Sequence, residues 1–148
     1  MQIMRVNLED LKTIMKIEKS VFKSESFSKQ TITKLILSNS LFLKLVENQK
    51  VSKTIGYIIA IHDNRHTINI INLSIKQEYQ SMGYGSYLLQ TTLELIKKNQ
   101  DIHKVILNVK TNNKIAIRLY QNFEFQIVQE IENYYSNHEN AYLMELIL

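Results

Sequence analysis

Residues 80–86 read Gln80-Ser81-Met82-Gly83-Tyr84-Gly85-Ser86, and they join an apolar, strand-like segment directly to the start of an amphipathic helix. The chain has no proline and only three glycines, so two glycines this close together mark a turn with a demanding backbone geometry. Backbone amides at a helix N-terminus are unpaired and partly positive, which attracts phosphate. Gly83 and Gly85 permit positive φ and close approach of an anion, while Gln80 and Ser86 offer side-chain donors. The stretch predicts a phosphate-binding turn; the alternative is a tight turn that merely needs glycine.

Two better-known phosphate motifs do not fit this turn. No Gly-Lys-Ser/Thr follows it, which excludes a Walker A loop. The third glycine of the dinucleotide fingerprint is missing, and only one strand–helix unit surrounds the turn. The ligand class is therefore not fixed by the turn alone.

The pattern of apolar residues outside the turn predicts a mixed α/β fold. It indicates the element order βααβββαβαββ, which is a central sheet with helices on both faces. Asn7, Ser28 and Asn113 are each placed to cap a helix. We expect strands at 1–6, 41–47, 54–62, 67–75, 104–110, 125–131 and 141–148, helices at 8–21, 28–38, 83–99 and 113–123, and a turn at 48–53.

The third expected strand, 67–75, changes phase along its length. Ile68 and Ile70 are in one alternation, whereas Ile71, Leu73 and Ile75 are in the other. A β-bulge shifts the alternation by one residue in this way. A strand that is buried on both faces is the alternative.

Composition limits the class of protein. A chain of 148 residues fits one domain, 1–148, and 45% hydrophobic with 22% charged residues is typical of a globular chain. The absence of cysteine excludes disulfides, thiolate metal sites and cysteine nucleophiles. The longest apolar run, 55–61, is too short to cross a membrane, and no signal peptide is evident. We expect a soluble cytoplasmic protein that is a monomer or a weak homodimer.

The charge pattern gives no specific partner. The net charge is +4, but the lysines are spread along the chain, which favours a general lysine excess over nucleic-acid binding. The four histidines lack the spacing of a metal site, so no metal is expected.

Three motifs together resemble the GNAT superfamily of N-acetyltransferases. The first is Gln80-x-x-Gly83-x-Gly85, and the second is residues 107–113 followed by Ala116, Leu119-Tyr120 and Phe125. The third, residues 132–135 and 139–144, is similar to the closing hairpin of ribosomal-protein-alanine and related protein N-α-acetyltransferases. The resemblance implies a GNAT-like fold and acetyl-coenzyme A as the acetyl donor.

The resemblance also implies where the donor binds. It would lie between two splayed strands that end near Ile75 and Lys110, opened by the bulge. Asn113 would contact it from a helix start, where the alternative is an ordinary N-cap. The implied donor-binding set is Leu73, Ser74, Ile75, Gln80, Ser81, Met82, Gly83, Tyr84, Gly85, Ser86 and Asn113.

Tyr120 matches the general acid of the family, which protonates the departing thiolate. The reference pKa values of phenol and thiol, about 10 and about 8.5, are close enough for this role. The alternative is a core tyrosine, since its helix spacing also fits an apolar face. Tyr134 and Tyr135 match a pair that holds the peptide substrate, and Phe22 and Phe27 are placed to form the opposite wall of the groove.

Two positions depart from the family pattern. Asn108 occupies the place of a catalytic glutamate and cannot take a proton, and the matching position on the preceding strand is Asn69. Two asparagines can still hold a water, and Glu25, His138 or solvent remain as proton acceptors. At Glu124 the family commonly has glycine, which predicts an altered turn.

A site that lacks a strong base is better suited to an α-amine substrate than to a lysine side chain. An α-amine with pKa near 8 is about one tenth neutral at pH 7, whereas a lysine is neutral in only a few parts in about ten thousand. The leading hypothesis is therefore direct attack by a protein N-terminal α-amine, with ribosomal proteins among the candidate substrates. The alternatives are an acetyltransferase for small amines and a coenzyme A-binding sensor without turnover.

Overall fold

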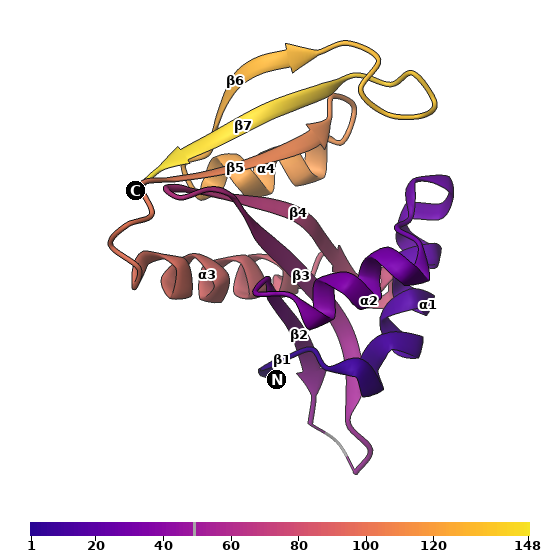
Figure 1. The fold of residues 1–148 in the computed structure, drawn as a ribbon. Helices are drawn as coiled ribbons and strands as arrows, with labels where there is room; N and C mark the ends of the chain where they lie inside the picture. The colour runs from indigo at the N-terminus through magenta and orange to yellow at the C-terminus, as the bar shows by residue number, and fades with distance from the viewer. Residues whose placement is uncertain (49) are drawn as a thin grey trace.

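Seven strands and four α-helices make up the computed structural model, which describes residues 1–48 and 50–148 (Figure 1). Residue 49, in the expected turn 48–53, lies outside the described residues. The elements are β1 (Gln2–Arg5), α1 (Leu11–Phe22), α2 (Lys29–Leu37), β2 (Leu41–Glu47), β3 (Lys53–Asn64), β4 (Thr67–Ile75), α3 (Tyr84–Lys97), β5 (Lys104–Lys110), α4 (Lys114–Asn122), β6 (Gln126–Ile131) and β7 (Ala141–Ile147).

The strands form one sheet in the order β1-β2-β3-β4-β5-β7-β6. The central neighbours β4 and β5 are parallel, and the other five pairs are antiparallel. The expected mixed α/β class and the order βααβββαβαββ are confirmed. The clearest difference in bounds is β3, which continues to Asn64 rather than ending at residue 62.

The sheet is covered on both faces. On one face, Ile14 and Ile17 of α1 and Ile32 of α2 pack with Tyr57 and Ile59 of β3. On the other, Leu88, Leu89, Leu93 and Ile96 of α3 pack with Leu43, Ile58 and Ile70, and this cluster extends to Tyr120 and Phe125. Because β3 and β4 lie between the two clusters, their apolar residues face both ways.

The phase change in β4 is a β-bulge. Ile59 of β3 is opposite Asn72 and the next residue, Ala60, is opposite Ile70, so Ile71 is the extra residue. The strand is also covered on both faces, so the two alternatives coexist. The parallel pairing of β4 with β5 stops just before the bulge, at Ile70 and Leu107.

Helix starts follow the capping residues. Asn7 forms a capping box with Asp10, although the first turn is a short 3-10 helix (Leu8–Asp10) before α1 begins. Ser28 accepts a hydrogen bond from the amide of Thr31, and Asn113 accepts one from the amide of Ala116. Helix α3 is different, because its N-cap Gly83 provides no side chain.

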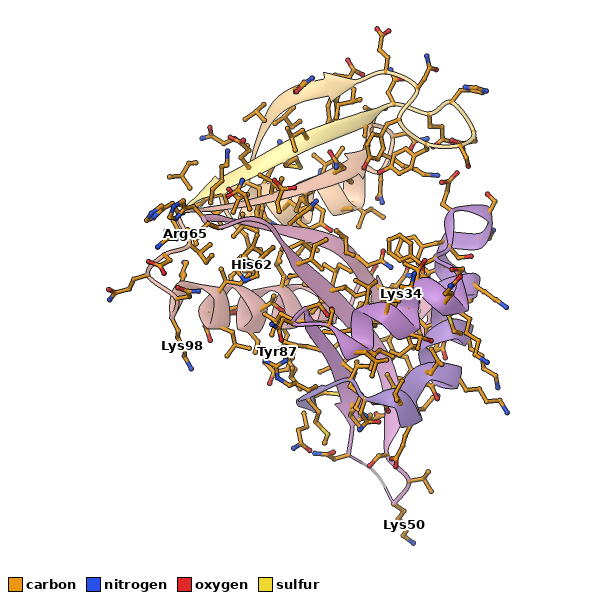
Figure 2. The ribbon with its side chains drawn as sticks, in the orientation of Figure 1. Lys34, Lys50, His62, Arg65, Tyr87 and Lys98 are labelled. Carbon is orange, nitrogen blue, oxygen red and sulfur yellow. The ribbon has the colours of Figure 1, made fainter. Side chains whose placement is uncertain are left out.

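The surface carries its basic side chains on separate parts of the molecule. Figure 2 shows Lys34, Lys50, Arg65 and Lys98 on well-separated segments. No helix among the described residues is long and apolar enough to span a membrane.

Candidate active site

The site is centred on the gap where β4 and β5 part. Beyond Ile70 and Leu107, the described residues show no pairing between these two strands, although β3 continues along β4 and β7 along β5. The gap is therefore bounded by two inner strand edges. Such edges present backbone donors and acceptors that can pair with an extended ligand as with another strand. The expected donor-binding residues Leu73, Ser74 and Ile75 form the β4 side.

The turn before α3 presents free backbone amides. Gly83, the N-cap, has φ 85°, so one of the two glycines does adopt the left-handed conformation. Helix α3 has no side-chain cap and no acidic residue in its first turn. The first amides of this helix are therefore open to an anion.

Only one of the two glycines uses the freedom to adopt positive φ. Among the glycines, Gly83 has positive φ, and the second unusual residue of the turn is Ser81, with φ 62°. A Cβ on Gly85 would lie 3.6 Å from Leu119 Cδ2 and 3.9 Å from Ile75 Cγ1, which are ordinary contacts. A side chain as small as alanine would therefore fit at Gly85 without strain, and neither backbone geometry nor close packing requires glycine there.

Gln80 pairs within the protein. Its Nε2 donates to the carbonyl oxygen of Ile75 at 2.8 Å, which ties the turn to the end of β4. This bond uses one of the two N–H donors of the Gln80 amide, so the expected contact with a phosphate stays a prediction. Among the other expected residues of the turn, Ser81, Met82 and Gly83 are exposed, and Tyr84, Gly85 and Ser86 are half-buried.

Tyr120 lies on α4 and is buried, with its ring edge-on to Phe125 at 5.8 Å between centroids. Burial raises the pKa of the Tyr120 phenol above its usual range, and the neighbouring Tyr135 raises it further. The phenol is thus a neutral hydrogen-bond donor throughout the physiological range. No side-chain hydrogen bond of Tyr120 occurs in the part of the chain that the structure describes.

The two loop tyrosines are held together beside β5. The rings of Tyr134 and Tyr135 meet edge-on at 4.9 Å, and Lys110 Nζ lies 5.2 Å from the centre of the Tyr135 ring. Lys110 also pairs with Glu139 at 3.2 Å. Burial, followed by the charges of its neighbours, raises the pKa of Tyr135 to about 12.

Asn108 connects β5 to this pair and leaves one acceptor unused. Its Nδ2 donates to the hydroxyl of Tyr134 at 3.2 Å. Its Oδ1 is buried and has no partner among the described residues. Asn69 is aligned with Ile106 on the neighbouring strand, so Asn69 and Asn108 lie on the same face of the sheet. The expected asparagine pair does share a face.

The segment between α1 and α2 carries Phe27, which was expected to form the opposite wall of the groove. The amide of Phe27 donates to Glu18 Oε1 at 2.7 Å, and the Phe27 ring packs against the cluster beneath α1. Glu25 in this segment accepts a hydrogen bond from Ser136 in the β6–β7 loop. The two loops are therefore joined by a side-chain hydrogen bond, and Figure 1 shows them facing each other at the same end of the molecule.

Sequence reasoning missed two residues near the site. Glu18 is a charged residue on the apolar face of α1 and is buried. Gly56 of β3 is the third glycine of the chain and lies opposite Ile75 in the register. A charge within an apolar stripe and a glycine within a strand were the available signals.

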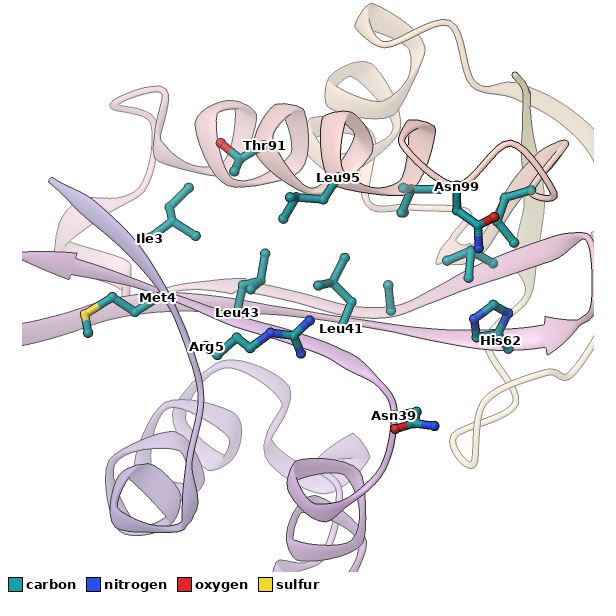
Figure 3. A pocket seen from close by; sticks show the side chains of 14 residues that line it. Ile3, Met4, Arg5, Asn39, Leu41, Leu43, His62, Thr91, Leu95 and Asn99 are labelled. Atoms are coloured by element: carbon teal, nitrogen blue, oxygen red, sulfur yellow. The ribbon is translucent and has the colours of Figure 1, made fainter.

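A separate cavity of about 550 Å³ lies on the other side of the molecule, between α3 and the β1–β3 strands (Figure 3). Its walls are mainly aliphatic, including Leu41, Leu43 and Leu95, and Arg5 and His62 also line it. None of the residues expected in the site belongs to this cavity. Among the described residues there is no cluster of three or more His, Asp or Glu that could hold a metal ion.

Comparison with known proteins gives one consistent result. The family model described as Acetyltransferase (GNAT) family matches residues 8–125. An N-alpha-acetyltransferase of Sulfolobus acidocaldarius is 34% identical over 76 residues, which is 51% of this chain and 45% of that relative, so the chain covers less than half of its length.

Two further likenesses extend over almost the whole chain. A Bacillus subtilis protein provisionally named as the ribosomal protein bS18-alanine N-acetyltransferase is 29% identical over 145 residues, 96% of this chain and 92% of that protein. The structure of Arabidopsis thaliana NAA60 in complex with acetyl-CoA has a TM-score of 0.87 at 18% identity and covers 99% of both chains. At that identity the structural likeness shows the fold.

Proposed function

The chain belongs to the acetyltransferase (GNAT) family, and on that basis we propose that it transfers the acetyl group of acetyl-coenzyme A to the N-terminal α-amine of a protein. The observation that carries the proposal is the parting of β4 and β5 after Ile70 and Leu107, next to the uncapped start of α3. The names of the relatives from Sulfolobus acidocaldarius and Bacillus subtilis support the N-terminal amine as acceptor.

The residues present fit the donor molecule. The free edge of β4 at Leu73, Ser74 and Ile75 offers backbone partners to the extended pantetheine arm. The amides at the start of α3 offer partners to the pyrophosphate, and Gly83 leaves open space there, since a Cβ added to it would meet nothing within 4 Å. Acetyl-coenzyme A supplies the activated thioester when it is bound.

Tyr120 would assist departure of the thiolate from the α4 side. Its raised pKa makes full proton transfer to a thiolate uphill, since a thiol has a pKa of about 8.5. We therefore assign Tyr120 chiefly a hydrogen bond that strengthens as negative charge develops on sulfur. The phenol has no competing side-chain partner among the described residues, so it is available for this bond.

Asn108 would orient the attacking amine. An amide oxygen that is buried without a partner costs about 1–3 kcal/mol, and accepting an N–H from the substrate removes that cost. Asn108 cannot take the proton, so the amine must arrive neutral or lose its proton to another acceptor. The amine nitrogen then bonds to the acetyl carbon as the carbon–sulfur bond breaks, with no covalent enzyme intermediate. The nitrogen loses one proton to solvent and the thiolate takes one up from solvent, so that the products are the amide and the free thiol.

Tyr134 and Tyr135 would hold the first residues of the peptide against the segment that carries Phe27. A tyrosine offers both an apolar face and a hydroxyl, which suits contact with a short peptide. The hydrogen bond from Asn108 to Tyr134 fixes this tyrosine pair to β5, the strand that carries the Asn108 oxygen proposed to bind the amine.

The test is a transfer assay with defined peptides. The purified protein is incubated with acetyl-coenzyme A and peptides that begin with alanine, serine or methionine, each with a free and a blocked N-terminus and with an internal lysine. A peptide copied from the N-terminus of a ribosomal protein and a set of small polyamines complete the panel. Mass spectrometry reports which amine gains an acetyl group, and Tyr120→Phe is the matched control for background acetylation.

Acetylation of free N-termini, with lysine untouched and a much lower rate for Tyr120→Phe, supports the proposal. Acetylation of polyamines alone would identify a small-amine enzyme. Binding of coenzyme A without transfer to any amine would identify a sensor, and would make Asn108 the residue to examine.

A further inference from the structure

Glu18 is a buried carboxylate that receives hydrogen bonds from three parts of the chain. Only 1% of the residue is exposed. Its Oε1 accepts the amide of Phe27 at 2.7 Å, and its Oε2 accepts Asn72 Nδ2 at 2.8 Å and the hydroxyl of Tyr57. One side chain of α1 thereby joins the α1–α2 segment to strands β3 and β4.

This arrangement is unusual for a helix whose neighbouring positions are apolar. Ile14 and Ile17, on the same buried face of α1, are 0% and 2% exposed. Glu18 forms no ion pair with any Lys, Arg or His of the described residues, so hydrogen bonds alone compensate its charge. Such burial is costly, and an apolar side chain would be the cheaper way to fill the space. The carboxylate is therefore suited to a role that packing alone does not supply.

The partners of Glu18 lie on the two sides of the proposed site. Phe27 closes the α1–α2 segment, in which Glu25 meets Ser136 of the opposite loop. Asn72 follows the bulge residue Ile71, at the start of the β4 edge that lacks a β5 partner. Two hydrogen bonds to one carboxylate thus connect the Phe27 segment, here called the acceptor wall because it would face the acetyl acceptor, to β4, here called the donor strand because it would hold the acetyl donor.

We propose that Glu18 is a positioning residue that fixes the Phe27 segment relative to β4, so that the acceptor wall and the donor strand keep one geometry. The inference rests on the proposed function, because it assigns the two sides to acceptor and donor. The competing explanation is that Glu18 only stabilises the fold. Burial and the adjacent Glu18 carboxylate raise the pKa of Tyr57, so the phenol stays a donor to Glu18 at all working pH values.

Glu18→Gln breaks the tether with little change in shape. A glutamine has one acceptor oxygen and one NH2 group. If its oxygen takes the Oε2 position, which serves two donors, the NH2 faces the Phe27 amide and that bond is lost. Tyr57→Phe is the matched control, because it removes a donor from the same carboxylate but leaves the bonds to Phe27 and Asn72.

The kinetic readout is the KM for peptide against the KM for acetyl-coenzyme A. A hydrogen bond to a charged group corresponds to about a tenfold change or more, so Glu18→Gln is expected to raise the peptide KM about tenfold. The KM for acetyl-coenzyme A should stay within about threefold of its original value, as should both constants in Tyr57→Phe. Asn72→Ala breaks the tether at its β4 end and should also raise the peptide KM.

A second readout needs no substrate. Amide hydrogen exchange of residues 23–28 should be about tenfold faster in Glu18→Gln than in the unchanged protein, with α2 and β3 unaffected. If the unchanged protein acetylates no peptide, the proposed function fails while this readout still tests the tether. Faster exchange throughout the chain, or an unchanged peptide KM in both Glu18→Gln and Asn72→Ala, would overturn the proposal in favour of a purely structural role.

Discussion

Replacing Gly56 of β3 by alanine is expected to distort the neighbouring strand β4, which forms the proposed donor side of the site. Gly56 lies on β3 opposite Ile75, at the end of the β4 edge that faces the gap. A Cβ at this position would lie 2.5 Å from the carbonyl oxygen of Ser74 and 2.5 Å from Ile75 Cδ1. The Ile75 side chain can rotate, but the carbonyl belongs to the backbone. Relief therefore requires movement of β4 relative to β3.

The size of that movement follows from the contact distance. To bring a carbon and an oxygen from 2.5 Å to an ordinary separation, the strands must part by about 0.5 to 1 Å. Overpacking of this kind costs about 1–3 kcal/mol, which lowers the Tm by about 2–12 °C in a domain of this size. A shift approaching 1 Å in β4, the strand proposed to hold the thioester, is expected to lower kcat/KM by about 10- to 100-fold.

The assay combines thermal unfolding, acetyl-coenzyme A binding and transfer rates. Gly83→Ala is the matched control for stability, since a Cβ there meets nothing within 4 Å and the cost is only that of positive φ. Gly56→Ala should weaken donor binding at temperatures where it is fully folded. If it keeps the original Tm and donor affinity, the close approach of β3 to Ser74 does not control the site and the reasoning is refuted.

Three other changes have defined outcomes. Tyr120→Phe should lower kcat about 10²- to 10³-fold with a small change in Tm, because the hydroxyl has no side-chain partner among the described residues; steady-state rates and thermal unfolding check both. The kcat/KM for peptide should rise with pH up to the α-amine pKa of about 8 and then level, as a pH–rate profile would show. No fall is expected up to about pH 10, because burial raises the pKa of Tyr120, and that of Tyr135 to about 12; a descending limb near neutral pH would contradict this. Glu124→Gly should stabilise the protein by about 0.5–1 kcal/mol, measured by denaturant unfolding, since Glu124 has φ 69°; equal or lower stability would show that its side chain offsets the strain.

Local sequence signals predicted the features that depend on neighbours in the chain. The phase change between Ile70 and Ile71 indicated either a bulge or a strand buried on both faces, and both are present. Ser28 and Asn113 predicted two helix starts. We expected an altered turn at Glu124, where the family commonly has glycine. The turn nevertheless keeps the left-handed conformation at this position, because Glu124 itself adopts it. Each of these features is decided within a few residues, where periodicity and capping act.

Long-range partners decided what the sequence did not predict. The hydrogen-bond partners of Glu18 lie 9, 39 and 54 residues away, so no local pattern could separate a hub from a stray charge on α1. Gly56 is required by the carbonyl of Ser74 on the next strand, which depends on the register across the bulge. The pairing of Gln80 with Ile75 also depends on how the turn folds back, so the sequence did not show that this side chain closes the turn.

The parting of β4 and β5 has a consequence for solubility. An unpaired strand edge normally invites association with other chains, and proteins protect the outer edges of their sheets for that reason. Here the vacant edges are internal, because β3 flanks one and β7 flanks the other. A strand from another protein would need to enter between two halves of the same sheet, whereas the single pantetheine arm of the proposed donor meets no such barrier. The chain can therefore keep unpaired backbone groups available to bind a ligand without exposing them to pairing with strands of other chains.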